Sequence, residues 1–138
     1  MKLKEIVAKY PTEQDFTKAV EEQLLLLAKE QPDFKYNTSG IKQVTCGYNG
    51  PAVLHRGSTT HLAGPECKGC IFGQALQNLG WDDASELTSG MTIDIVLSFL
   101  SDKNRLNLWR QIQGNQDTGN TWSEAVSLLS ANTPVAGE

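Results

Sequence analysis

Most of the chain carries apolar residues at helical spacing, with polar residues between them. Thr12 and Asp15 are typical of a helix start, and Pro32 ends the apolar stripe that follows, so one long helix is predicted between them. The same spacing predicts a shorter helix before Pro11 and four further helices. Their predicted ranges are about 3–10, 71–79, 92–100, 103–116 and from 121 onward.

Residues 34–56 alternate apolar and polar positions, which indicates short antiparallel strands. Residues 56–69 have no period and predict a long loop. These patterns predict an α+β fold, in which a mostly helical single domain over residues 1–138 carries a small antiparallel β-hairpin or three-stranded sheet. The tail at 131–138 is expected to be frayed.

Composition and charge bear on the partners of the protein and on its compartment. The net charge of −4 argues against a nucleic-acid partner, because binding to phosphate backbones relies on a basic surface. Since no apolar run is long enough to cross a bilayer and no secretory segment is evident, we expect a cytoplasmic protein without a membrane partner. Three cysteines fit no disulfide framework.

The cysteines offer a candidate zinc site. Cys67 and Cys70 form a CxxC pair, which can supply two thiolates from one turn, and His61, His55 and Cys46 are candidates to complete the ligands. Because one CxxC pair occurs without a second, the alternative that Cys46 and Cys70 pack as small core residues stays open. A bound zinc would be structural, and the protein would then be a zinc-stabilised interaction module; otherwise we expect no cofactor.

Cys70 also stands at the predicted start of the 71–79 helix, where the helix dipole favours a thiolate. With His61 or His55 as its base, this cysteine could serve a small hydrolase. The sequence contains no nucleophile elbow, P-loop, dinucleotide fingerprint or zincin motif. Enzymatic activity therefore stays open, and a non-enzymatic function is favoured.

The same helix start predicts an anion-binding site, because the first backbone N–H groups of a helix lack partners within it. The preceding segment carries more basic than acidic residues. The predicted ligand-binding residues are Tyr48, His55, Arg56, His61, Lys68 and Gly69. We therefore expect a non-enzymatic binding or accessory protein that holds an anionic, nucleotide-like ligand or a host protein.

Residues 113–124 are interpreted as structural. Thr121 and Glu124 match a capping box, Gly119 can turn the chain, and Trp122 is expected to pack between two helices. The alternative is a polar ligand cluster that includes Gln113, Gln116 and Asp117.

Two segments, "CIFGQALQNLG" at 70–80 and "IQGNQDTGNTWSEAV" at 112–126, carry a resemblance. The chain resembles small uncharacterised proteins of actinobacteria and their phages, which share a Cys-hydrophobe-x-Gly-x-Ala-Leu-x-x-Leu-Gly helix and a Gln-Asp-x-Gly-x-Thr-Trp turn. The resemblance implies a shared fold and a phage context, and that group has no established activity. Cys67, His55 and His61 fall in a stretch that is longer here than in the group, so a site built from them would be particular to this protein.

Overall fold

The structure, a computed structural model, describes residues 1–35, 44–45, 53–56, 58–61, 69–83 and 92–132. Within these ranges the helices are α1 (Leu3–Ala8), α2 (Glu13–Glu30), α3 (Ile71–Asn78), α4 (Ile93–Val96), α5 (Lys103–Asp117) and α6 (Trp122–Asn132). α6 continues two residues into the tail that was expected to be frayed.

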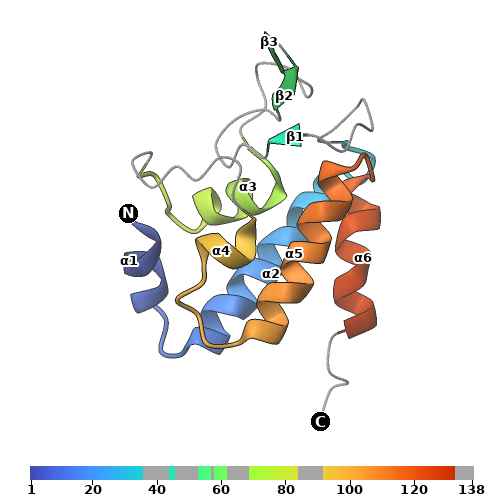
Figure 1. Ribbon diagram of the computed structural model, residues 1–138. Coiled ribbons are helices and arrows are strands. Elements are labelled where there is room, and N and C mark those ends of the chain that lie inside the picture. Colours follow the sequence, from blue (N-terminus) through green and yellow to red (C-terminus); the bar gives the residue numbers. More distant parts are fainter. Residues whose placement is uncertain (36–43, 46–52, 57, 62–68, 84–91, 133–138) are drawn as a thin grey trace.

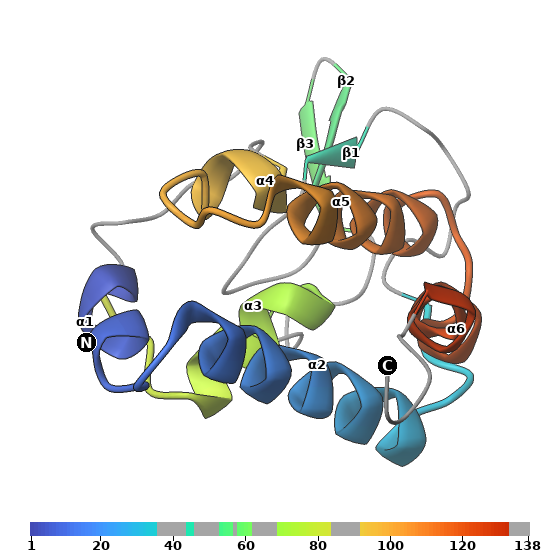
Figure 2. The same ribbon diagram turned by 90° about the horizontal axis from the view of Figure 1, so that it is seen from below.

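The helices surround a central helix, α3. Figure 2 shows α3 between α2 on one side and α5 on the other, with α1 and α6 at opposite ends. α2 packs against α3 and α6, while α5 packs against α3, α4 and α6. The largest fully buried side chains include Trp109, Trp122, Phe16 and Phe72, so all the long helices contribute to one core.

The predicted α+β class is wrong. The side chains of the three short strands described below are not among those that the structure describes. Of the residues whose side chains it does describe, 67% are helical and 2% are extended, and these residues form no sheet or hairpin. Every buried apolar residue described comes from a helix or its flanking connection. The apolar stripes of the helices bury one another, so this core is closed by helix packing.

Three short strands lie beside the helices, where the structure describes the backbone. β1 (Val44–Thr45), β2 (Val53–Arg56) and β3 (Ser58–His61) pair antiparallel in the order β1-β2-β3. β2 and β3 project away from the helices (Figure 1). β3 lies inside the segment 56–69, so the prediction of a continuous loop there was wrong.

The alternation at 34–56 begins with Phe34 and Tyr36, but the described residues 34 and 35 form no strand. Lys35 forms an isolated bridge with Thr121, and the Phe34 carbonyl accepts a hydrogen bond from the Trp122 N–H at 2.9 Å. These bonds join the end of α2 to the start of α6. Tyr36 lies outside the described residues.

Capping hydrogen bonds and glycine conformations at the helix ends confirm most of the predicted helix boundaries. The Thr12 hydroxyl accepts from the Asp15 N–H at 3.1 Å, and Thr121 and Glu124 exchange hydrogen bonds at 2.9 and 3.1 Å. Gly80 and Gly119 adopt φ angles of 112° and 103°, which favour glycine and close the C-termini of α3 and α5.

The helix predicted at 92–100 is shorter than expected. α4 ends at Val96, and the chain continues in turns in which Ser98 N donates to Ile95 O and Leu100 N donates to Leu97 O. These i to i+3 turns keep Leu97 and Leu100 buried at nearly helical spacing. The apolar pattern therefore could not distinguish them from a longer helix.

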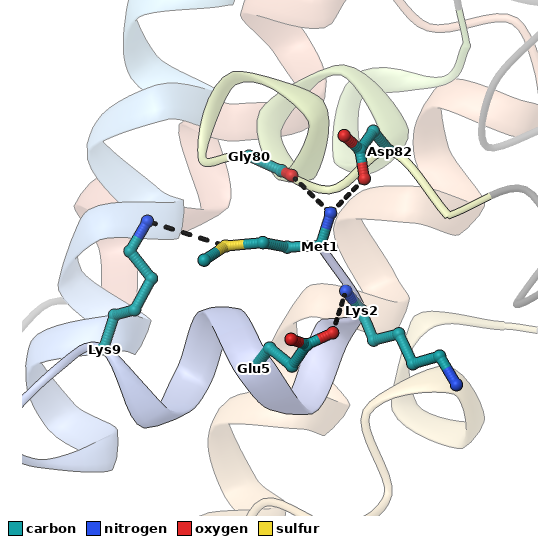
Figure 3. Close-up of polar contacts among 6 residues, drawn as sticks. All are labelled: Met1, Lys2, Glu5, Lys9, Gly80 and Asp82. Carbon is teal, nitrogen blue, oxygen red and sulfur yellow. Dashed lines mark hydrogen bonds and ion pairs between the residues drawn. The ribbon is translucent and has the colours of Figure 1, made fainter.

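The N-terminus docks α1 against the end of α3 (Figure 3). The Met1 ammonium group forms an ion pair with Asp82 and donates to the Gly80 carbonyl at 3.3 Å. Lys2 N donates to Glu5 Oε1 at 3.0 Å, which closes the first turn of α1. Asp82 thus has a structural contact at the end of α3.

Candidate functional site

The start of α3, where the sequence predicted an anion site, is buried, and two of its N–H groups have side-chain acceptors. Ile71 N donates to Gln116 Oε1 at 3.4 Å, and Gly73 N donates to Cys70 Sγ at 3.4 Å. The Gly69 carbonyl accepts from Gln74 Nε2 at 2.8 Å. Two N–H groups at the predicted anion site are thus already bonded within the protein, and the anion site stays a prediction.

The other predicted ligand-binding residues are described only in part. His55 and Arg56 lie in β2 and His61 ends β3, where the structure gives the backbone. Tyr48 and Lys68 lie outside the described residues. Gly69 directly precedes the buried helix start and adopts a φ of 139°.

Cys70 is a core residue with a capping role. Its side chain is 0% exposed, is not in a disulfide, and accepts the Gly73 N–H as the N-cap of α3. This burial fits the core interpretation of Cys70.

The structure brings no metal site together in its described part. Among those residues, no group of three or more His, Cys, Asp or Glu side chains is placed to hold an ion. Cys67 and Cys46 lie outside the described residues, so the zinc hypothesis stays a prediction.

The polar residues near the end of α5 are structural, as the sequence indicated. Gln113 and Gln116 are buried, and each side-chain carbonyl accepts the first N–H of another helix: Ile93 N at 2.7 Å and Ile71 N at 3.4 Å. Gln116 Oε1 also accepts from Trp122 Nε1 at 3.3 Å. One glutamine therefore joins α3, α5 and α6.

Asp117 sits next to this junction and is an unusual acid. Burial raises the pKa of Asp117 from 3.8 to about 7, although the hydrogen bond donated by Gln116 acts in the opposite direction. The folded protein thus binds a proton at this carboxyl more tightly than the unfolded chain does.

We expect this proton to make stability depend on pH. The contribution of Asp117 is fully present below about pH 4 and is lost as the pH rises to about 7, because the folded carboxyl must then ionise while buried. Urea unfolding at several pH values should show this decline in the wild type and a flatter profile in Asp117→Asn. Identical profiles would contradict the assignment.

A pocket of about 300 Å³ lies between the N-terminal half of α2 and the start of α5. No pattern in the sequence predicted it. Its apolar wall consists of Leu100, Leu106 and Trp109. Its polar wall consists of Glu13, Gln14, Thr17, Ser101, Asp102 and Arg105. We call this feature the α2–α5 pocket.

Glu21 fixes one side of the pocket. Its carboxylate accepts from both Nε and Nη2 of Arg105, and from Trp109 Nε1 at 2.7 Å. The hydrogen bonds to Glu21 raise the pKa of Arg105, against the effect of partial burial. The positive charge is therefore neutralised by a bidentate partner, and both pocket side chains are held in place.

Glu13, another residue of the lining, is also held in place. Its Oε1 accepts from Ser101 N at 2.8 Å and from Ser101 Oγ at 2.7 Å. These bonds hold the pKa of Glu13 below its ordinary value, because they stabilise the ionised form. Asp102 caps α5 by accepting from Arg105 N at 3.0 Å. Two carboxylates thus border the pocket.

The pocket combines an apolar wall with several hydrogen-bonding groups, the usual composition of a small-molecule site. Its lining contains no cysteine or histidine. The sequence held only weak signals for it, because Glu13 and Ser101, like Glu21 and Arg105, are more than eighty residues apart.

No family model, curated protein or solved structure matches the chain. The resemblance to actinobacterial and phage proteins therefore stays a prediction. Within the described residues, no helix combines the length and the apolar character needed to span a membrane.

Proposed function

We propose that the protein is a non-enzymatic binding protein that holds a small polar molecule in the α2–α5 pocket. The observation that carries this proposal is the pocket itself, whose lining combines six polar residues with two leucines and a tryptophan. Its volume of about 300 Å³ lies at the lower end of the range for ligand sites. The ligand is therefore small.

The charges around the pocket favour an uncharged or cationic ligand. Glu13 and Asp102 border it, and the charge of Arg105 is already neutralised by Glu21. An anion would meet two carboxylates without an unpaired arginine to offset them. This ligand class differs from the nucleotide-like anion that the sequence predicted for the start of α3.

The preformed hydrogen bonds support binding without chemistry. Glu21, Arg105 and Trp109 hold one another, while Glu13 is held by Ser101, so the walls are ordered before a ligand arrives. The Ser101 hydroxyl donates to Glu13 at 2.7 Å, and the same carboxylate oxygen also accepts from the Ser101 N–H, so this pair joins the start of α2 to the segment before α5. No cysteine or histidine, the more usual partners in covalent catalysis, lines the pocket. A cytoplasmic accessory role, in a phage context, is part of the same proposal.

A thermal-shift screen of small amines, polyols, nucleosides and nucleotides tests the proposal. We expect an uncharged or cationic compound to raise the melting temperature, because it binds only the folded state. Thr17→Phe fills the pocket and should abolish the effect, whereas Arg110→Phe, on the exposed side of α5, should retain it.

Calorimetric titration then gives the affinity of each compound for both variants. If nucleotides alone bind, and bind Thr17→Phe as tightly as the wild type, the ligand site lies elsewhere and the proposal is wrong. A screen in which no compound binds would also contradict it.

A further inference from the structure

α2 exposes two leucines on the side that faces away from the core. Leu25 and Leu26 are 47% and 49% exposed, while Leu24 and Leu27 on the opposite side are buried. Two adjacent exposed leucines on one helix form a small apolar patch. We call the surface around them the outer face of α2.

Charged residues flank the leucines on this outer face. Lys18, Glu22, Leu25 and Lys29 are spaced by four, three and four residues, so they follow one line along the helix. All are exposed, and in the described part of the chain none of these charged residues forms an ion pair. Their charges are available to a partner.

The charges along this line are complementary to those of a second copy of α2 that runs antiparallel. When two α2 helices pack antiparallel about a two-fold axis between Leu25 and Leu26, each residue meets the residue equally far on the other side of the axis. Leu25 meets the partner's Leu26, and Glu22 meets the partner's Lys29. Every contact occurs twice, as in any two-fold interface.

Opposite charges therefore face each other at two symmetry-related places, one on each side of the apolar centre. Packing of two antiparallel helices through such a face is a common geometry.

We propose that the outer face of α2 is a homodimer interface, and that its partner is a second copy of this chain. An unrelated partner would require no such symmetry of charge about Leu25 and Leu26, whereas a two-fold axis requires it. The interface is centred on a single helix pair, which is smaller than the usual interface of about 1,600 Å². We therefore expect a weak dimer with a dissociation constant in the micromolar range.

Sedimentation equilibrium of the full chain over about 1–500 µM, in about 50 mM salt, tests this proposal. Wild type should dimerise. Glu22→Lys and Lys29→Glu should each weaken dimerisation about tenfold or more, because like charges then face each other. Arg110→Glu changes the net charge as Lys29→Glu does, but lies on α5, and should dimerise as the wild type does.

Mixing the two variants gives the sharpest outcome. Glu22→Lys and Lys29→Glu should form a mixed dimer with nearly wild-type affinity, because opposite charges face each other again across the axis. The double variant with both changes should recover in the same way. Circular dichroism should show that each variant is folded.

A wild type that stays monomeric throughout the concentration range overturns the proposal. So does a dimer that neither charge reversal weakens, or one that the Arg110→Glu variant weakens as strongly. Failure of the mixture to recover would show that the two positions do not face each other.

Discussion

Replacing Trp122 with alanine lowers the free energy of unfolding by about 3–5 kcal/mol, which is the usual cost of removing a buried aromatic side chain. Trp122 is 0% exposed, and its ring lies 4.5 Å from that of Phe34. Its Nε1 donates to Gln116 at 3.3 Å. Alanine would leave a cavity between the end of α2 and the start of α6. The side-chain carbonyl of Gln116 would also lose one of its hydrogen bonds.

Urea unfolding followed by circular dichroism measures this loss. Trp122→Phe is the companion variant, since it keeps an aromatic ring but loses the hydrogen bond, and it should lose less stability than the alanine variant. Ligand binding at the α2–α5 pocket should survive in Trp122→Phe. Unchanged stability with complete loss of binding would mean that Trp122 belongs to a site.

Replacing Gln116 with leucine lowers the free energy of unfolding by about 3 kcal/mol, even though leucine has a similar size and is more apolar. The change leaves the buried N–H groups of Ile71 and Trp122 without their acceptor. An unsatisfied buried donor costs about 1–3 kcal/mol. α3 and α6 would both lose their link to α5.

The control is Gln111→Leu, an exposed position on the same helix, where the change should stay within about 0.5 kcal/mol. The pH dependence of stability provides a second test of Gln116→Leu, through the neighbouring carboxyl of Asp117. Gln116 lowers the pKa of this carboxyl, so its removal raises that pKa further. The leucine variant should therefore lose more stability at pH 8 than at pH 5. Equal stability of Gln116→Leu and Gln111→Leu would refute the role of Gln116.

The sequence predicted helices well where their signals are local. The caps at Thr12 and Thr121 and the glycines at 80 and 119 lie within a few residues of the bonds they form. The stripe through Phe16, Val20 and Leu24 likewise predicted which side of α2 is buried. The fold class was wrong because alternation over a short segment says nothing of how much core the helices build by themselves.

The α2–α5 pocket could not be predicted from the sequence, because its contacts join distant parts of the chain. Trp109 lies in the helix predicted at 103–116, at a position with the spacing of the apolar stripe, and it is buried. Nothing in the local pattern indicated that its Nε1 meets Glu21, 88 residues away. Nothing in the local pattern indicated either that Gln116, 45 residues away, accepts the Ile71 N–H at the start of α3, and the anion site expected there stays a prediction.

Chemical-shift mapping of the ¹⁵N-labelled protein with a compound from the thermal-shift screen tests the proposed binding site most directly. The three tryptophans give three indole N–H signals. Binding at the α2–α5 pocket should shift the Trp109 indole signal and the backbone signals of residues 13–17 and 101–106, and leave the indoles of Trp81 and Trp122 nearly unchanged. Shifts centred on Gly69, Cys70 and Ile71, with no change at Trp109, would contradict it.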